Sequence, residues 1–563
     1  MTDTGAASYL RAVALFEGLA AAGLVHVVVS PGSRSTPLAL AAARCRGFRM
    51  HVVADERSAG FFALGLTRAT GLPTALVATS GSAPAHWLPA AIEACEDSQP
   101  LLLLSADRPP ELLDCGANQA TTQDRLFAAH ARGVFGLPAE ADAAHARDLG
   151  RRAAAACLWP RRGPVHLNIA FREPLVAAEP DACAPWSPTS AGIHLPGRTT
   201  PDLGAVAAAA ARLAGRRGAI LAGRLAAGDP AGPAALALAR SLDCAVIADP
   251  LSGLRAGGDP EVRVLCAADA FLRRRDAPVP DWLIRIGAPP VSRLVEEWAA
   301  RCPETLLLAA TPDWSDPLRA AHTVLLGDPA ASLSVLAAAT GRAGLRAAAW
   351  PALEQLEAGA TDALQELDTP PAEAALVRAI AASALAGTPL FVGNSLVVRD
   401  FDSFLPRRAE PLPIYANRGV SGIDGNISTA AGIVTAAGVP GIAVIGDLAL
   451  FHDLNALALC HDLPLVLVVI NNGGGAIFGE LSQAGLPEFE RLWLTPPGMD
   501  LSRAAALFGL DYARLDPGTA LEGVLSAALA AGRPALLELV VEREASCLAR
   551  RAWWQSCSDT SGL

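Results

Sequence analysis

Residues 441–478 constrain the fold of this chain more strongly than any other stretch of its sequence. Two short apolar runs, at 442–445 and 463–470, are rich in β-branched residues and leucine. They are too short for buried helices and are apolar on both faces, which is typical of central strands in a parallel sheet. The residues between them, 448–460, have helical spacing. The stretch is therefore predicted to form a strand–helix–strand unit of an α/β fold.

Polar residues follow both apolar runs. Asp447 comes just after the first run, and the pair Asn471 and Asn472 leads from the second run into glycines 473–475. Neighbouring parallel strands end at the same edge of a sheet, where ligands of open α/β folds bind. Carboxylate, amide and backbone carbonyl oxygens suit Mg²⁺ or Ca²⁺, and glycines let the backbone approach a diphosphate. The pattern indicates a metal-bridged diphosphate site, although the same residues are also common in turns that close strands.

The composition excludes several classes of protein. A net charge of −11 argues against a nucleic-acid or anionic-membrane surface, although local arginine clusters can still bind anionic metabolites. The 11 cysteines are scattered and never form CxxC, which suggests neither a disulfide framework nor a zinc site. All 45 basic residues are arginine, so a Walker-type phosphate lysine and a Schiff-base lysine are excluded.

The sequence also lacks the signals of a membrane or secreted protein. No apolar run approaches the roughly 20 residues that are needed to span a bilayer. Residues 1–18 do not show a basic region followed by an apolar one, as a secretory signal would. We therefore expect a cytoplasmic protein.

A chain of 563 residues is long enough for three domains, and its pattern predicts three doubly wound parallel-sheet α/β domains, at 1–185, 200–345 and 369–563. Residues 177–200, rich in Pro, Ser, Ala and Gly, are typical of a linker, and the alanine-rich residues 341–368 of a helical linker. The central domain has no GxGxxG with an acidic residue at the expected distance, so a nucleotide site is weakly supported there. The main expected strands are 25–29, 50–53, 74–78, 100–104, 165–169, 218–222, 245–248, 282–286, 305–309, 323–326, 390–392, 442–445, 463–470 and 534–541.

Several arginines lie in loops that follow the expected strands of the first domain. Ser33 and Arg34 crowd the start of a helix, where N–H groups, hydroxyls and a guanidinium can all address an anion. The arginine opposes the helix dipole unless an anion shares the site, although the hydroxyl residues also fit an ordinary helix cap. Arg108, Asn118 and Gln119 follow the strand at 100–104 and are plausible ligand contacts, which a polar surface loop explains nearly as well.

Two loops of the third domain carry similar residues. The strand at 390–392 runs into GNSLVVRD, which brings Ser395 and Arg399 together, and the glycine-punctuated residues 414–432 supply Arg418 and Ile423. Glu56 opens the helix that follows the strand at 50–53. An acidic residue in a first turn is an ordinary partner of the helix dipole, so Glu56 does not stand out by itself.

These motifs together resemble a known family. The spacing from Gly446 to Asn472 resembles the Gly-Asp … Asn-Asn signature of thiamine-diphosphate enzymes, with GDL in place of the common GDG. SPGSRSTPLALA, DERSAGFFALGL, ADRPPELLDCGANQATTQ, GNSLVVRD, NRGVSGIDG and GDLALFHDLNALAL are jointly similar to the MenD family, the 2-succinyl-5-enolpyruvyl-6-hydroxy-3-cyclohexene-1-carboxylate (SEPHCHC) synthases. The resemblance covers both end domains nearly completely and is weak in the central one.

The resemblance implies a thiamine diphosphate cofactor with Mg²⁺, or with Mn²⁺. It implies that domain 1–185 binds the pyrimidine of the cofactor and domain 369–563 its diphosphate and metal. Asp447, Asn472 and the carbonyl of Gly474 would bind the metal, and Glu56 would hydrogen-bond a ring nitrogen of the aminopyrimidine. Such a glutamate is expected to be buried. The cofactor-binding residues implied are Glu56, Gly446, Ile423, Asn472, Ile477 and Phe478.

The resemblance also implies a reaction: decarboxylation of 2-oxoglutarate and addition of the resulting succinyl carbanion equivalent to isochorismate, in menaquinone biosynthesis. It implies a homodimer with shared active sites, or a tetramer. Glu56 and Gln119 would be catalytic. The substrate-binding residues implied are Ser33, Arg34, Arg108, Asn118, Gln119, Arg293, Ser395, Arg399 and Arg418. The sequence departs from the family at Ser292–Arg293, where many members have adjacent lysine and arginine, and at His86, where asparagine is common.

Two other functions stay open. The chain could be another thiamine-diphosphate 2-oxo acid decarboxylase or carboligase with a smaller substrate, or a non-catalytic metabolite-sensing relative. The number of arginines favours the synthase over a pyruvate enzyme, because pyruvate has no second carboxylate to bind. The presence of Glu56 favours a catalytic protein over a sensor.

Overall fold

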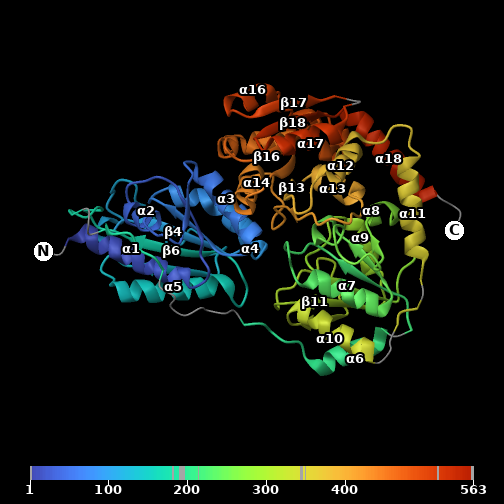
Figure 1. Ribbon diagram of the computed structural model, residues 1–563, viewed down its shortest axis with the longest axis horizontal. Helices are drawn as coiled ribbons and strands as arrows, with labels where there is room; N and C mark the ends of the chain where they lie inside the picture. The colour runs from blue at the N-terminus through green and yellow to red at the C-terminus, as the bar shows by residue number, and fades with distance from the viewer. Residues whose placement is uncertain are drawn as a thin grey trace. The chain divides into compact units, whose positions relative to one another are not determined.

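The computed structural model describes residues 3–179, 183–188, 197–213, 215–342, 346–348, 350–516 and 519–559 (Figure 1). The described strands form three six-stranded sheets, and every pair of neighbouring strands in them is parallel. The chain divides into two compact units. The first unit comprises Met1–Gly197, Asn417–Val439 and His452–Leu463, and the second comprises Arg198–Ala416, Pro440–Phe451 and Pro464–Leu563.

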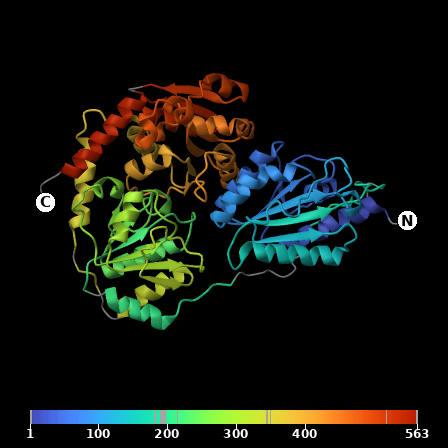
Figure 2. The same cartoon turned by 180° about the vertical axis from the view of Figure 1, so that it is seen from behind.

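The sheet of the first unit has the order β2-β1-β3-β4-β6-β5. Alternate residues along its central strands face two separate cores. Val27 packs with α1, α2 and α5 on one face, whereas Val28 packs with α3 and α4 on the other. Figures 1 and 2 show α1 and α5 side by side. The elements are α1 (Thr4–Ala20), β1 (His26–Val29), α2 (Thr36–Ala43), β2 (Arg49–Val52), α3 (Glu56–Thr70), β3 (Thr74–Ala78), α4 (Leu88–Glu96), β4 (Leu101–Asp107), β5 (Gly133–Leu137), α5 (Ala143–Leu158) and β6 (Val165–Ala170).

Two segments from the C-terminal part of the chain, Asn417–Val439 and His452–Leu463, belong to the first unit. The first of them contains α14 (Asn426–Ala437), a helix that packs closely across α3. A Cβ atom at Gly65 would overlap the carbonyl oxygen of Thr429, and a Cβ at Gly432 would overlap that of Phe62. The two glycines therefore allow the helix backbones to touch, which no larger residue permits.

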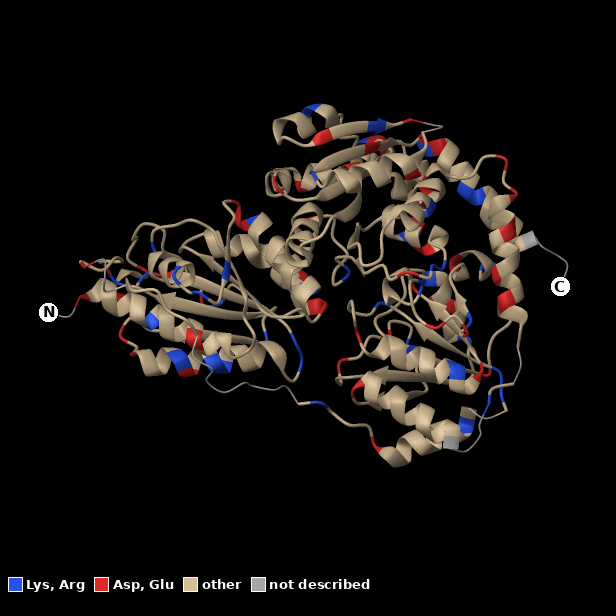
Figure 3. Cartoon of the chain, in the orientation of Figure 1, with Lys and Arg blue, Asp and Glu red and all other residues tan. Residues whose placement is uncertain are grey.

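The second unit contains the other two sheets, with the orders β12-β11-β10-β7-β8-β9 and β14-β13-β15-β16-β18-β17. Figure 3 shows that charged residues gather on helices and loops, whereas the strands of the sheets carry few. The strands are β7 (Gly218–Ala222), β8 (Ala245–Ala248), β9 (Val264–Leu265), β10 (Trp282–Ile286), β11 (Thr305–Ala309), β12 (Thr323–Leu326), β13 (Leu390–Val392), β14 (Ile414–Tyr415), β15 (Gly441–Gly446), β16 (Leu465–Asn471), β17 (Asp511–Leu515) and β18 (Ala535–Val540).

The helices of the second unit cover its two sheets and connect their strands. They are α6 (Leu203–Leu213), α7 (Ala231–Leu242), α8 (Ala268–Phe271), α9 (Arg293–Ala300), α10 (Pro329–Arg342), α11 (Ala352–Gln365), α12 (Ala372–Ser383), α13 (Leu396–Phe404), α15 (Asp447–His452), α16 (Leu501–Leu507), α17 (Leu521–Ala531) and α18 (Arg543–Asp559). None of the helices in the described parts of the chain is long and apolar enough to cross a membrane.

The structure confirms the α/β class and the central strands but corrects one prediction. The single helix expected at 448–460 is wrong, because α15 ends at His452 and the 3₁₀ helix η5 (Leu454–Cys460) follows. Asp453 lies between them and accepts hydrogen bonds from the backbone N–H and the Oγ of Ser428 at 2.9 and 3.1 Å. This contact with α14 marks the point where the helix is interrupted.

The two predicted linkers fall partly outside the described residues. Within 177–200, residues 180–182 and 189–196 are not described. Within 341–368, the described residues belong mainly to α11, so this stretch is helical as expected. The exact domain boundaries stay predictions.

A buried polar cluster joins β4 to β6. The Oγ of Ser105 lies 2.7 Å from Nε2 of His166, and Asn168 donates a hydrogen bond of 2.7 Å to Asp107. His166 is fully buried, and this burial lowers the pKa of its imidazole from 6.5 to about 4. The ring is therefore neutral in the folded protein at neutral pH.

We predict that His166 makes the protein sensitive to acid. Its pKa is lower in the folded state than in the unfolded state, so stability is lost as the pH falls from 6.5 toward 4. The imidazole should remove about 2 kcal/mol of stability between pH 7 and pH 5. Urea unfolding of His166→Gln should show a smaller loss over this range than wild type. The exposed His145→Gln serves as control, and equal losses in all three proteins would contradict the assignment.

We also predict that the contact between α3 and α14 tolerates no side chain at Gly65. Gly65→Ala should destabilise the protein by about 1–3 kcal/mol, because the new methyl group meets backbone that must move. Gly359→Ala in α11 is a matched control, since a Cβ at this position meets no atom within 4 Å. The control should be neutral or stabilised by about 0.4–1 kcal/mol in thermal unfolding. Equal melting temperatures for the two variants would contradict this prediction.

Candidate functional site

Asp447 lies at the carboxyl end of β15, in the second unit, and begins α15. The residue is 1% exposed. One carboxylate oxygen accepts a hydrogen bond of 2.8 Å from the N–H of Leu448, and the other accepts one of 2.7 Å from the N–H of Gly474. Burial raises the pKa of Asp447 to about 6, against the effect of these backbone hydrogen bonds. The negative charge is thus held in a place where a bound cation would stabilise it.

Asn472 follows β16, the strand paired with β15, so its position is next to that of Asp447 at the sheet edge. Its amide Oδ1 is buried and has no hydrogen-bond partner within the described residues. The preceding Asn471 instead donates a hydrogen bond of 2.6 Å to Glu538. The structure therefore separates the two asparagines and leaves the oxygen of Asn472 available for a ligand.

Gly474 completes this group of predicted metal ligands. Its φ is +123°, and a Cβ there would overlap the carbonyl oxygen of Leu494, so only glycine fits. In the part of the chain that the structure describes, no three His, Cys, Asp or Glu residues form a metal cluster. The predicted set contains one carboxylate and two neutral oxygens, which suits Mg²⁺ that also binds a diphosphate.

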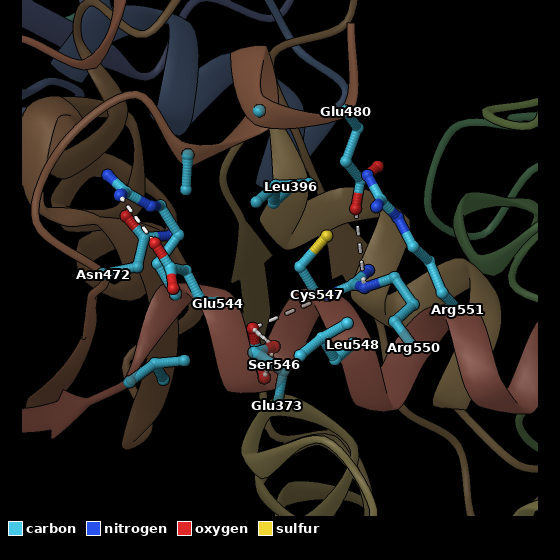
Figure 4. Close-up of a pocket in the computed structure, with 14 residues that line it drawn as sticks. Glu373, Leu396, Asn472, Glu480, Glu544, Ser546, Cys547, Leu548, Arg550 and Arg551 are labelled. Atoms are coloured by element: carbon cyan, nitrogen blue, oxygen red, sulfur yellow. Dashed lines mark hydrogen bonds and ion pairs between the residues drawn. The ribbon is translucent and has the colours of Figure 1, made fainter. Parts of the chain in front are cut away.

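A pocket of about 300 Å³ adjoins Asn472 in the second unit (Figure 4). Leu396 and Ala476 contribute to its lining, and α18 supplies Cys547 and Arg550. The predicted cofactor residues Ile477 and Phe478 lie in the short 3₁₀ helix η6 (Ala476–Glu480) and are half-buried. The remaining predicted cofactor residue, Gly446, ends β15 directly before Asp447.

Charged groups that line or adjoin this pocket form a buried network that the sequence did not reveal. Arg550 contacts Asp400 at 2.5 Å and Glu373 at 3.5 Å, and the hydroxyl of Ser546 donates to Glu373 at 2.7 Å. Glu373 and Ser546 are 173 residues apart in the chain, so no local motif connects them. Ser546 and Arg550 are four residues apart, a spacing that places both on one face of a helix but does not indicate their partners.

The structure brings the predicted residues Ser395 and Arg399 together. Nη1 of Arg399 donates a hydrogen bond of 2.6 Å to the carbonyl oxygen of Ser395, and Arg399 is exposed. Ser395 has φ +68° and ψ −127°, an unfavourable conformation for a residue other than glycine. Such strain is found preferentially at ligand-binding positions.

Arg293 has a different environment. It is the first residue of α9, its side chain is 84% exposed, and it pairs with Glu297 at 2.8 Å. The neighbouring Ser292 caps α9 and donates to Asp269. The contacts of Arg293 are those of a surface residue, and its role in substrate binding stays a prediction.

In the first unit, the loops after β1, β3 and β4 bring Arg34 and Arg108 to the same sheet edge. Arg34 is 6% exposed; its guanidinium donates to the carbonyl oxygen of Phe171 at 3.0 Å and pairs with Glu173 at 2.9 Å. Arg108 hydrogen-bonds Ser80. Burial and the nearby positive charge of Arg34 lower the pKa of the Arg108 guanidinium.

The other predicted residues of this edge are more open. Ser33, Asn118 and Gln119 are exposed, and Gln119 has φ +52° and packs against Gly81. Two buried arginines bordered by exposed polar side chains can bind a carboxylate ligand.

Glu56 is the first residue of α3, directly after the helix cap Asp55. It is partly exposed in the single chain, whereas a buried glutamate was expected. Arg418 and Ile423 lie in the loop that enters α14, in the same unit as Glu56, and both are half-buried. Another residue of this unit that the sequence did not reveal is Glu93, which is buried and binds the loop carrying Arg418.

Comparisons with known proteins find family matches in the N-terminal and C-terminal parts of the chain. Residues 12–131 match the N-terminal TPP binding domain of thiamine pyrophosphate enzymes, and residues 401–539 match the C-terminal TPP binding domain. An X-ray structure from Mycobacterium smegmatis, of a candidate thiamin diphosphate-dependent enzyme, shares the fold with a TM-score of 0.69. Its sequence identity is 22%, and the match covers 94% of this chain and 98% of that chain.

Sequence relatives are much closer. The chain is 42% identical over 546 residues to the SEPHCHC synthase of Dechloromonas aromatica, a match that covers 96% of this chain and 99% of the relative. It is 40% identical over 520 residues to the synthase of Geobacillus kaustophilus, covering 88% and 89% of the two chains. Identity of this extent, over nearly the whole of both proteins, shows that the chain belongs to the 2-succinyl-5-enolpyruvyl-6-hydroxy-3-cyclohexene-1-carboxylate synthase family of thiamine-diphosphate enzymes.

Proposed function

We propose that this protein decarboxylates 2-oxoglutarate and adds the resulting succinyl carbanion equivalent to isochorismate, giving 2-succinyl-5-enolpyruvyl-6-hydroxy-3-cyclohexene-1-carboxylate in menaquinone biosynthesis. The observation that carries this proposal is the 42% identity to a SEPHCHC synthase over 96% of the chain. The buried Asp447 and the unpartnered oxygen of Asn472 support it, because they fit a cofactor bound through a metal.

Asp447, Asn472 and the carbonyl of Gly474 would hold the metal, which we propose to be Mg²⁺ with Mn²⁺ as an alternative. When bound, thiamine diphosphate would supply a carbon nucleophile and a group that accepts the electrons released by decarboxylation. Gly446, Ile477 and Phe478 would lie against it. Ile423 would contact it, and the carboxyl of Glu56 would share a proton with a ring nitrogen of its aminopyrimidine.

The arginines would bind and orient the substrates. 2-Oxoglutarate and isochorismate each carry two carboxylates, and Arg34, Arg108, Arg399 and Arg418 supply matching guanidinium groups. A charge-assisted hydrogen bond contributes roughly 1.5–3 kcal/mol, so loss of one arginine should weaken substrate capture about tenfold to a hundredfold. Gln119 would act next to the reacting atoms.

We further propose that the protein works as a homodimer or tetramer. The partial exposure of Glu56 in the single chain supports this, because a proton shared with the cofactor requires that water be excluded. A second subunit that supplies the diphosphate half of the site would provide the cover.

The test of the function is ultraviolet detection of isochorismate loss by the purified protein with thiamine diphosphate and Mg²⁺. We expect loss with 2-oxoglutarate but not with pyruvate or without an oxo acid. Glu56→Gln should abolish turnover while leaving cofactor affinity largely unchanged, since it removes only the shared proton. Activity with pyruvate, or an unchanged rate in Glu56→Gln, would overturn the substrate or the catalytic assignment respectively.

The metal site has a separate test. Asp447→Asn should weaken Mg²⁺-dependent binding of thiamine diphosphate at least about tenfold, because the single charged ligand is lost. Calorimetric titration with and without EDTA measures this affinity. Asp462→Asn is the control, since the Asp462 side chain is 93% exposed. Equal affinities for the two variants would rule out Asp447 as a metal ligand.

A further inference from the structure

A buried glutamate anchors the loop that carries Arg418. Glu93 lies in α4, is 2% exposed and belongs to the first unit together with residues 417–439. Its Oε1 accepts a hydrogen bond of 2.7 Å from the N–H of Gly419, and its Oε2 accepts one of 2.8 Å from the N–H of Val420. Both oxygens of the carboxylate therefore hold the two peptide groups directly after Arg418.

The charge of Glu93 is unfavourable in its own helix. Glu93 and Asp97 lie at the C-terminal end of α4, where the helix dipole opposes negative charge. Arg68 from the last turn of α3 pairs with both carboxylates, and the side chains of Arg68 and Glu93 are 6% and 2% exposed. The peptide N–H groups of the loop add further compensation for the charge of Glu93.

The loop is also fixed on both sides of Arg418. Before it, the amide of Asn417 donates a hydrogen bond of 2.9 Å to Oγ1 of Thr429 in α14. After it, a Cβ atom at Gly419 would overlap the backbone carbonyl oxygen of Glu93, so glycine is required at this position. The backbone of Arg418 is therefore held between α14 and α4.

We propose that Glu93 is a positioning residue, which sets the direction of Arg418 for a substrate carboxylate. This inference rests on the proposed function, in which Arg418 binds substrate. An arginine whose backbone is already fixed loses less conformational entropy when it binds a ligand than an arginine on a mobile loop. A buried ion pair is weak evidence for stability alone, whereas its bonds to this loop give it a specific role.

The first experiment compares the kinetics of two variants of the same charge cluster. Glu93→Gln keeps one acceptor oxygen but turns an NH₂ group toward a peptide N–H, so the loop loses an anchor. Asp97→Asn removes the other carboxylate that pairs with Arg68. Arg418→Ala identifies the substrate that Arg418 binds, because it raises the KM for that substrate. For the same substrate, we expect Glu93→Gln to raise KM roughly tenfold, with kcat within about twofold of wild type. Asp97→Asn should change this KM much less.

A double-mutant cycle separates positioning from a general structural role. In the Arg418→Ala background, Glu93→Gln should raise KM no further, because the residue through which it acts is absent. If Glu93→Gln raises KM by the same factor in both backgrounds, or leaves it unchanged in the wild-type background, the proposal is wrong.

Hydrogen exchange at the amides of Gly419 and Val420 tests the anchor without any activity. Exchange should be slow in wild type and faster in Glu93→Gln, and an unchanged rate would overturn the anchoring. If Glu93→Gln does not fold, Gly419→Ala offers a substitution in the loop instead of in α4. It should displace the loop and accelerate hydrogen exchange at the same two amides. This readout also separates the two proposals: a wild-type protein that consumes neither substrate but shows the protected amides refutes the function and not the anchor.

Discussion

Parallel pairing of β15 with β16 is the constraint on which the diphosphate half of the site depends. The register sets Gly446 opposite Ile470, so Asp447 and Asn472 emerge from the same sheet edge. Hydrogen bonding between the carboxylate of Asp447 and the N–H of Gly474 then joins the two following loops. The N–H groups of Leu448 and Gly474 take the place of water around the buried carboxylate, and a bound cation would add charge compensation.

The sequence predicted strand bounds correctly where both faces of a strand are buried. The strands at 218–222, 245–248 and 282–286 were predicted with the bounds that the structure has, since burial on both faces produces a continuous apolar run. β5, β9, β14 and β17 were not predicted, and all four lie at sheet edges. Four of the five residues in β5 and in β17 are exposed or half-buried, and β9 and β14 contain only two residues each, so none of them produces a continuous apolar run.

The site was predictable to the level of its motifs but not of its individual contacts. The residue pattern did not distinguish Asn471 from Asn472, and only the family resemblance selected Asn472 as a ligand. In the structure, the partner of Asn471 is Glu538, on a strand that is adjacent only in the folded sheet. In the same way, nothing near Glu93 in the sequence indicates its bonds to Gly419, 326 residues away. Long-range hydrogen bonds of this kind depend on the packing of whole elements, which local patterns do not encode.

The contact between α3 and α14 has a consequence for the order in which the chain matures. Gly65 and Gly432 belong to one compact unit, although more than half of the chain separates them. A ribosome releases the N-terminal sheet long before it has made α14 and η5, which complete the packing around α3. During that interval the apolar surface of α3 that later contacts α14 and η5 is exposed to solvent. The N-terminal sheet and its helices can therefore complete their packing only after the C-terminal part of the polypeptide has been synthesised.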